Sequence, residues 1–302
     1  MLSNHRPLWL YPLFQIPGIF LGIFLVLAML FWLLGLGRPN VAVVVALDLS
    51  ASTYQPSSFN APDTVMSQEV AAVKSYIEQS SQQLKVPNEI QIMGFGGQVV
   101  PLTSRFLSDR QQLETELNQS LSNPNLPLQI GSGTNLNQAI EKGVEALGSI
   151  SQHCRELLLV TDGAEVDVSP SVVAQAASQG VKINALIIGA DVPQLQAATA
   201  TTKGLYILGV GNALQKFFRD KFFPSFNSNL RWIVLWLGAA WVSFMWLLSL
   251  PLDRWIFQGW LGYPMNLAGQ LALGNALFWS ALTPLILWQV WKLLDLPFFS
   301  SC

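Results

Sequence analysis

Three short segments of the sequence place carboxylates and hydroxyls where apolar, strand-like runs end. The first is "ALDLSAS", in which Asp48, Ser50 and Ser52 follow the run "VAVVVAL". The second is "GSGTNL", which contains Thr134, and the third is "TDG", which contains Asp162. Two carboxylates and three hydroxyls make an all-oxygen set, and such a set suits a hard divalent cation such as Mg²⁺ or Mn²⁺. Only two formal negative charges would face the cation, so the site need not repel a further acidic ligand. An incomplete coordination shell would leave room for such a ligand.

Each of these residues also has a plainer structural interpretation. Thr134 can cap the helix that is expected to follow it, because Thr is a favoured N-cap residue. Asp162 and Gly163 can form a turn, and Ser50 and Ser52 can be ordinary loop hydroxyls. The cation interpretation therefore depends on whether the fold brings the three segments to one place.

The middle of the chain predicts an α/β fold that brings the three segments to one place. Val-, Ile- and Leu-rich strands separated by amphipathic helices are typical of a doubly wound, Rossmann-like, mostly parallel sheet covered on both faces. A hairpin after the second strand adds one antiparallel edge strand, and Ser108 with Gln111 predicts a capping box at the next helix. Ligands bind such sheets beyond the carboxyl ends of the strands, where all three segments lie. We expect strands at 41–48, 89–96, 98–103, 155–162, 181–189 and 204–209, and helices at 64–84, 135–150, 171–180, 192–202 and 212–223.

The pattern D-x-S-x-S, then T-N-L after a Gly-rich loop, then L-L-x-T-D-G resembles the signature of von Willebrand factor type A (vWA) domains. The resemblance covers about residues 40–223. It implies a metal-ion-dependent adhesion site in which Ser50, Ser52 and Thr134 bind the metal directly, while Asp48 and Asp162 often act through water. It also implies Mg²⁺ as the cofactor, with Mn²⁺ or Ca²⁺ as the other cations, and an acidic residue of a protein partner as the ligand.

The two ends of the chain have a different composition. The whole sequence is 51% hydrophobic and 11% charged, and all eleven Trp lie outside the predicted α/β domain. Apolar runs at 17–37, 232–252 and 267–291 are long enough to cross a membrane as helices. We expect residues 1–37 to form an uncleaved anchor, because the run is too long for a signal peptide and lacks a cleavage motif. Residues 253–266 form a Trp-rich loop at the membrane interface in this interpretation.

This layout is similar to that of the bacterial Bat-type membrane proteins, which implies an adaptor or an assembly or maturation factor that works with a MoxR-type AAA+ ATPase. A hydrolase that uses the same cation, or a component of a transport complex, are the alternatives. The sequence has no phosphate-binding loop, and its only histidine in the α/β region is His153, at the wrong end of a strand for a base. No basic cluster indicates nucleic-acid binding, so the expected partners are a protein and membrane lipids.

The charges beside the apolar runs predict the side on which the vWA domain lies. Three spans place the domain and the C-terminus on one side of a bacterial inner membrane, opposite the N-terminus. Six basic residues lie near span ends on the domain side, against only Arg6 and Arg254 on the other. The positive-inside rule therefore favours the cytoplasm, whereas the Bat-type resemblance favours the periplasm. The six residues are Arg38, Lys216, Arg219, Lys221, Arg231 and Lys292.

Overall fold

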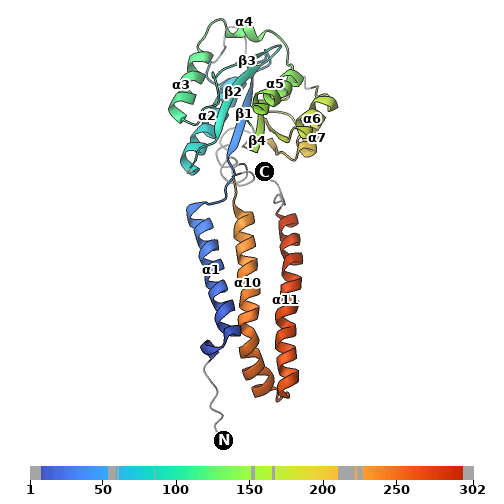
Figure 1. Cartoon of the computed structure of the whole chain (residues 1–302). Helices are drawn as coiled ribbons and strands as arrows, with labels where there is room; N and C mark the ends of the chain where they lie inside the picture. Colours follow the sequence, from blue (N-terminus) through green and yellow to red (C-terminus); the bar gives the residue numbers. More distant parts are fainter. Residues whose placement is uncertain are drawn as a thin grey trace. The chain divides into compact units, whose positions relative to one another are not determined.

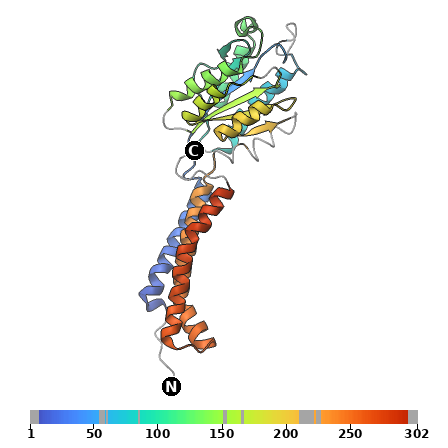
Figure 2. The same ribbon diagram turned by 90° about the vertical axis from the view of Figure 1, so that its right-hand side faces the viewer.

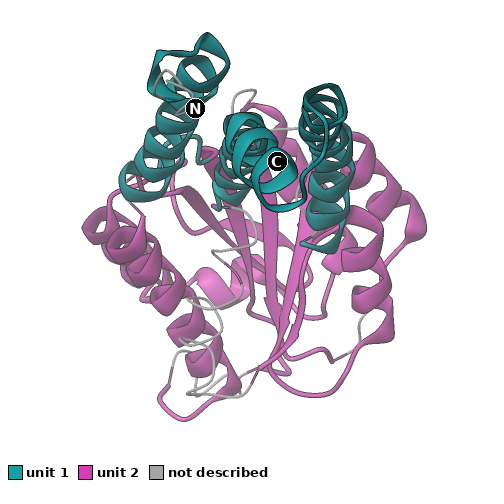
Figure 3. Cartoon of the chain, turned by 90° about the horizontal axis from the view of Figure 1, so that it is seen from below, with its two compact units in different colours: residues 1–38, 228–302 teal, residues 39–227 magenta. Residues whose placement is uncertain are grey.

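The structure is a computed structural model, and it divides the chain into two compact units, coloured separately in Figure 3. One unit comprises residues 39–227, and the other comprises residues 1–38 together with 228–302. The helix expected over 212–223, apart from Phe222, and also His153, lie outside the described residues. The structure describes residues 8–53, 59, 61–84, 86–150, 154–164, 167–209, 222 and 227–294.

The unit of residues 39–227 is built on a six-stranded sheet with the order β3-β2-β1-β4-β5-β6. Every neighbouring pair is parallel except β2 and β3, which are antiparallel and place β3 at one edge. The predicted mostly parallel sheet with one antiparallel edge strand is therefore confirmed. The strands are β1 (Val41–Asp48), β2 (Glu89–Phe95), β3 (Val99–Pro101), β4 (Cys154–Thr161), β5 (Val181–Ile187) and β6 (Tyr206–Leu208).

Helices cover both faces of this sheet. Figure 1 shows α2 and α3 on one side and α5, α6 and α7 on the other, and Figure 2 looks onto the second group. Every residue of β1 is buried, as expected for a central parallel strand. Ala42 and Val44 share a hydrophobic cluster with Ile140 and Leu147 of α5, while the alternate residues of β1 point to the opposite face. The helices are α2 (Val65–Gln83), α3 (Arg110–Leu121), the short α4 (Leu126–Ile130), α5 (Leu136–Gly148), α6 (Pro170–Ser178) and α7 (Pro193–Thr202).

One local prediction was wrong. The helix α3 does not begin with a capping box at Ser108, because its N-cap is Asp109, whose carboxylate accepts a hydrogen bond of 2.7 Å from the backbone N–H of Gln112. Asp is as good a cap as Ser, and its negative charge also interacts favourably with the helix N-terminus. The carboxylate therefore outcompetes the neighbouring hydroxyl for this position.

Among its described residues, the other unit contains three helices that are long and apolar enough to cross a membrane. They are α1 (Pro12–Leu34), α10 (Leu230–Pro251) and α11 (Met265–Leu293), and α10 packs beside both of the others (Figures 1 and 2). A short 3₁₀ helix, η1 (Leu8–Leu10), precedes α1. The stretch that we expected to be a loop over 253–266 is helical in its first part, since a π-helix, η4 (Leu252–Trp260), continues α10. The turn between α10 and α11 is therefore shorter than we expected.

Small and polar side chains tie these three helices together. Asn229, at the start of α10, donates hydrogen bonds of 2.6 and 2.9 Å to the carbonyl oxygens of Phe31 and Leu36 at the end of α1. Trp246 of α10 donates to the hydroxyl of Ser280 in α11 at 2.9 Å. Such contacts, together with close packing of small residues, are how helices associate where water is absent.

Candidate functional site

The ends of β1 and β4 bring the two candidate aspartates to one edge of the sheet. The two strands are parallel neighbours, and Leu47 of β1 is paired with Val160 of β4. Asp48 ends β1, and Asp162 directly follows the end of β4. Because both strands run in the same direction, the two carboxylates belong to the same carboxyl edge, where ligands bind in open α/β sheets.

Asp48 is held in place from two sides. Its side chain is completely buried, and its two carboxylate oxygens accept hydrogen bonds from the backbone N–H of Ser50 (2.9 Å) and from the hydroxyl of Thr161 (2.5 Å). Burial raises the pKa of the Asp48 carboxyl; the hydrogen bonds from Ser50 and Thr161 oppose this increase, and the charge of Asp162 adds to it. A buried carboxylate beside a second negative charge is stabilised by a cation.

The two serines of the first segment place their hydroxyls side by side. Their Oγ atoms lie 3.0 Å apart, with Ser50 buried and Ser52 exposed. Two oxygens that bind one octahedral Mg²⁺ at right angles, each at about 2.1 Å, are also separated by about 3.0 Å. The two hydroxyls form a hydrogen bond with each other, and their separation also equals that of two adjacent Mg²⁺ ligands. The exposure of Ser52 leaves this side of the site open to solvent.

The Gly-rich segment that contains Thr134 is folded against the end of β2, the other neighbour of β1. The backbone N–H of Asn135 donates to the carbonyl oxygen of Gly96 at 2.7 Å, and Leu49 donates to the carbonyl of Phe95 at 2.7 Å. A Cβ atom added at Gly97 would lie only 2.3 Å from the backbone oxygen of Ser132, so this close approach requires glycine. The second segment, which contains Thr134, thus also lies at the carboxyl edge of the sheet.

Thr134 is not the N-cap of the helix that follows it. The N-cap of α5 is Asn135, whose side-chain oxygen accepts a hydrogen bond of 3.1 Å from the N–H of Gln138. Thr134 is half-buried, and its hydroxyl has no hydrogen-bond partner within the described part of the chain. Asp162 does form a turn, because one of its oxygens accepts from the N–H of Ala164 at 2.9 Å. Its second carboxylate oxygen remains available as an acceptor.

Sequence reasoning missed two residues beside this edge. Thr161 precedes Asp162 and orients Asp48 through its hydroxyl, a role that the strand pattern alone does not reveal. Glu69 of α2 is completely buried, and burial raises its pKa well above the usual range, with the charges of Asp48 and Asp162 adding to the increase. The available signal for Glu69 was a carboxylate on the apolar face of the predicted helix 64–84. Within the described ranges, no three His, Cys, Asp or Glu side chains gather closely enough to hold a metal alone, so the hydroxyls are essential to the proposed ligand set.

The comparison with known families identifies the fold. The family model of the von Willebrand factor type A domain matches residues 42–228, more than half of the chain. The chain therefore belongs to this family, as the sequence signature predicted. A search of curated proteins finds no match.

Several solved structures are similar to this chain. BatB from Bacteroides thetaiotaomicron, described as a conserved hypothetical protein, is 17% identical, with a TM-score of 0.49, covering 61% of this chain and 97% of BatB. An aerotolerance-related membrane protein from Bacteroides fragilis is also 17% identical, with a TM-score of 0.48, covering 60% of this chain and 98% of that protein. Proximal thread matrix protein 1 from the mussel byssus, described with a zinc-occupied MIDAS motif, is 14% identical, with a TM-score of 0.45, covering 60% and 47% of the two chains. At these identities the similarity concerns the fold and identifies no ligand or partner.

Proposed function

We propose that this vWA-family chain is a membrane-anchored binding module that captures a protein partner through a divalent cation at the carboxyl edge of its sheet. The observation that carries this proposal is the pair of Ser50 and Ser52 hydroxyls, 3.0 Å apart, beside the buried carboxylate of Asp48. Domains of this family are usually binding modules rather than enzymes, which supports a non-catalytic role.

The five candidate residues divide into two groups in this proposal. The hydroxyls of Ser50, Ser52 and Thr134 bind the cation directly, and the carboxylates of Asp48 and Asp162 act through water. Both oxygens of Asp48 already accept hydrogen bonds, which suits a water-mediated role better than a direct one. The cation is Mg²⁺, with Mn²⁺ or Ca²⁺ as substitutes, and when bound it offers a coordination position to an acidic side chain of the partner.

The helical unit supplies the membrane attachment in this proposal. Residues 1–37 are the anchor, residues 40–223 the vWA domain, and residues 232–252 and 267–291 the further spans, with 253–266 at the interface. Large apolar side chains are exposed on these helices, including Trp32 at 69%, Leu277 at 58% and Phe278 at 58%. Exposed apolar surface of this extent is suited to contact with lipid rather than with water.

We also propose a location and a class of partner. The charges flanking the spans favour a bacterial inner-membrane protein whose vWA domain faces the cytoplasm, with the periplasm as the alternative. On the cytoplasmic side the domain is accessible to a MoxR-type AAA+ ATPase, the partner that the Bat-type layout suggests. The chain then acts as an adaptor or as an assembly or maturation factor for that ATPase.

The experiment compares the purified full chain in detergent with its Thr134→Ala variant. Mg²⁺ at about 100 times its Kd should stabilise the wild-type vWA unit by about 2.7 kcal/mol, since a ligand of the folded state stabilises that state by mass action. Thr134→Ala should reduce this gain without destabilising the cation-free protein, because the hydroxyl has no partner within the described residues. Thr201→Ala is the matched control, since Thr201 is exposed and bonds only to its own helix.

Partner capture tests the second half of the proposal. Immobilised full chain should retain its protein partner in Mg²⁺ and release it in EDTA, and Thr134→Ala should retain less of it than Thr201→Ala. A Mg²⁺ response that is the same in wild type, Thr134→Ala and Thr201→Ala contradicts the cation site. If EDTA does not change the amount of partner that is captured, the partner does not bind through the cation.

A further inference from the structure

Glu69 occupies an unusual position on α2. The backbone N–H of Met66 donates to the carbonyl oxygen of Thr53 at 3.2 Å, so the first turn of α2 is attached to the loop that carries the candidate serines. Glu69 lies three residues beyond Met66 and four before Val73, and residues at these spacings share one face of a helix. All three side chains are completely buried, so Glu69 lies on the covered face of α2.

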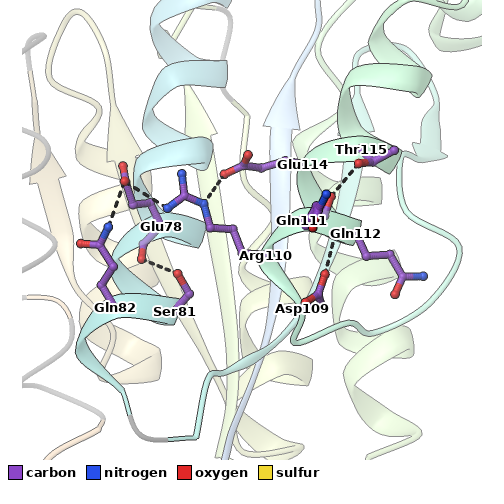
Figure 4. Close-up of polar contacts among 9 residues, drawn as sticks. All are labelled: Glu78, Ser81, Gln82, Asp109, Arg110, Gln111, Gln112, Glu114 and Thr115. Atoms are coloured by element: carbon purple, nitrogen blue, oxygen red, sulfur yellow. Dashed lines mark hydrogen bonds and ion pairs between the residues drawn. The ribbon is translucent and has the colours of Figure 1, made fainter.

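The carboxylate of Glu69 has no compensating partner within the part of the chain that the structure describes. Both of its oxygens are buried and neither makes a hydrogen bond. Glu78 of the same helix shows the usual arrangement, because it lies at the surface and forms an ion pair of 3.1 Å with Arg110 of α3 (Figure 4). A buried carboxylate without a partner is costly, and this cost requires an explanation.

The charged groups that act on Glu69 point to the explanation. They are Asp48 and Asp162, both negative, and no basic side chain of the described residues offsets them. The covered face of α2 that carries Glu69 is thus close enough to Asp48 and Asp162 for their charges to act on it, beside the loop that holds the two candidate serines. Without a cation, burial and these charges favour the uncharged form of Glu69, whereas a divalent cation would offset the repulsion and favour the carboxylate.

We propose that Glu69 is a third carboxylate of the cation site, which acts on the cation through water from the covered face of α2. This inference rests on the proposed cation site and adds to it a residue that the D-x-S-x-S, Thr and Asp motif does not contain. A water-mediated position agrees with the absence, among the described residues, of three carboxylates close enough to bind one ion directly. The cation is then held by three negative charges rather than by the two of the motif.

The expected consequence is tighter cation binding. Loss of an outer-shell partner typically weakens metal affinity about 10- to 100-fold. Glu69→Gln removes the charge and retains the shape of the side chain, so the affinity for Mg²⁺ should fall within this range. The same substitution should change the thermal stability of the cation-free protein little, because burial raises the pKa of Glu69 and favours its uncharged form.

The test is isothermal titration of the full chain in detergent with MgCl₂, with thermal unfolding measured in EDTA. Glu78→Gln is the matched control, since it removes one carboxylate from the same helix at a surface position. Glu69→Met, which suits the apolar face, is a second variant in case the buried amide prevents folding. A Kd for Glu69→Gln at least tenfold above wild type, with Glu78→Gln unchanged, supports the inference.

The outcomes separate this inference from the proposed function. If both Glu69 variants bind Mg²⁺ within twofold of wild type while Thr134→Ala binds it more weakly, Glu69 is not part of the site and the site itself stands. If the wild-type chain binds no Mg²⁺, the proposed function fails, and the inference fails with it.

Discussion

Glu156 provides a prediction about pH, because it is a buried acid at the centre of the sheet. It lies on β4, is completely buried, and accepts a hydrogen bond of 2.8 Å from the side-chain amide of Asn184 on β5. The ammonium group of Lys182 is 3.7 Å from its other oxygen. Burial raises the pKa of Glu156 from 4.5 to about 7, although Lys182 and Asn184 act in the opposite direction.

The direction in which pH changes the stability follows from the two pKa values of Glu156, 4.5 in the unfolded state and about 7 in the folded state. Between pH 4.5 and about 7 the folded state keeps the proton on Glu156 and the unfolded state has lost it. The folded state therefore binds more protons, and the contribution of this group to stability falls as the pH rises through this window. The shift from 4.5 to about 7 corresponds to about 3 kcal/mol, at about 1.4 kcal/mol for each tenfold change in proton affinity.

The perturbation is Glu156→Gln, which keeps an acceptor for Asn184 and cannot ionise. As the pH rises from 4.5 to 7.5, the free energy of unfolding of the variant should fall by about 3 kcal/mol less than that of the wild type. Hydrogen exchange of peptides from β4 and β5 is the suitable assay, because all eleven Trp lie outside residues 39–227 and Trp fluorescence does not report on this unit. Glu145→Gln, an exposed carboxylate paired with Lys142, is the control. Parallel pH profiles for wild type and Glu156→Gln would refute the reasoning.

Two further predictions concern the Gly-rich loop and the membrane. Gly97→Ala should displace the loop that carries Thr134 and reduce the Mg²⁺-induced stabilisation in thermal unfolding, because its Cβ would lie 2.3 Å from the backbone oxygen of Ser132; a full Mg²⁺ response would contradict this. Protease added to intact spheroplasts should leave residues 40–223 uncut if the domain faces the cytoplasm, and digestion without lysis would place the domain in the periplasm.

The sheet was predictable because its signals are local and repeated. The run of β-branched and aliphatic residues from Val41 to Leu47 indicates a strand buried on both faces, and the apolar spacing of Ile140 and Val144 indicates the helix that covers it. Parallel strands end at a common edge, so the parallel arrangement was enough to predict that Asp48 and Asp162 belong to the same edge. That these residues bind a cation stays a prediction, and a measurement of cation binding tests it.

The start of α3 and the end of α10 were harder, for a different physical reason. At α3, Ser108 and Asp109 are both good caps, and the difference in free energy between adjacent capping positions is small compared with the accuracy of sequence rules. At the end of α10 we expected a loop over 253–266, yet helical hydrogen bonding continues through η4. Pro251 is the last residue of α10 and directly precedes η4, so the proline coincides with the change from α-helical to π-helical geometry.

Glu69 shows why the cation site could be predicted only in part. In the sequence it is one carboxylate in an amphipathic helix, and a helix of this kind places most of its carboxylates in water, as α2 does with Glu78. Its position on the covered face follows from the rotation of α2 about its own axis, which the bond between Met66 and Thr53 helps to set. The apolar residues of the helix place Glu69 on the covered face, but they do not tell which end of the sheet this part of the helix lies against. Asp48 and Asp162, in contrast, lie at or directly after strand ends, where the backbone determines their place. A carboxylate on a helix therefore requires the packed structure before it can be assigned to the site, whereas Asp48 at the end of a strand does not.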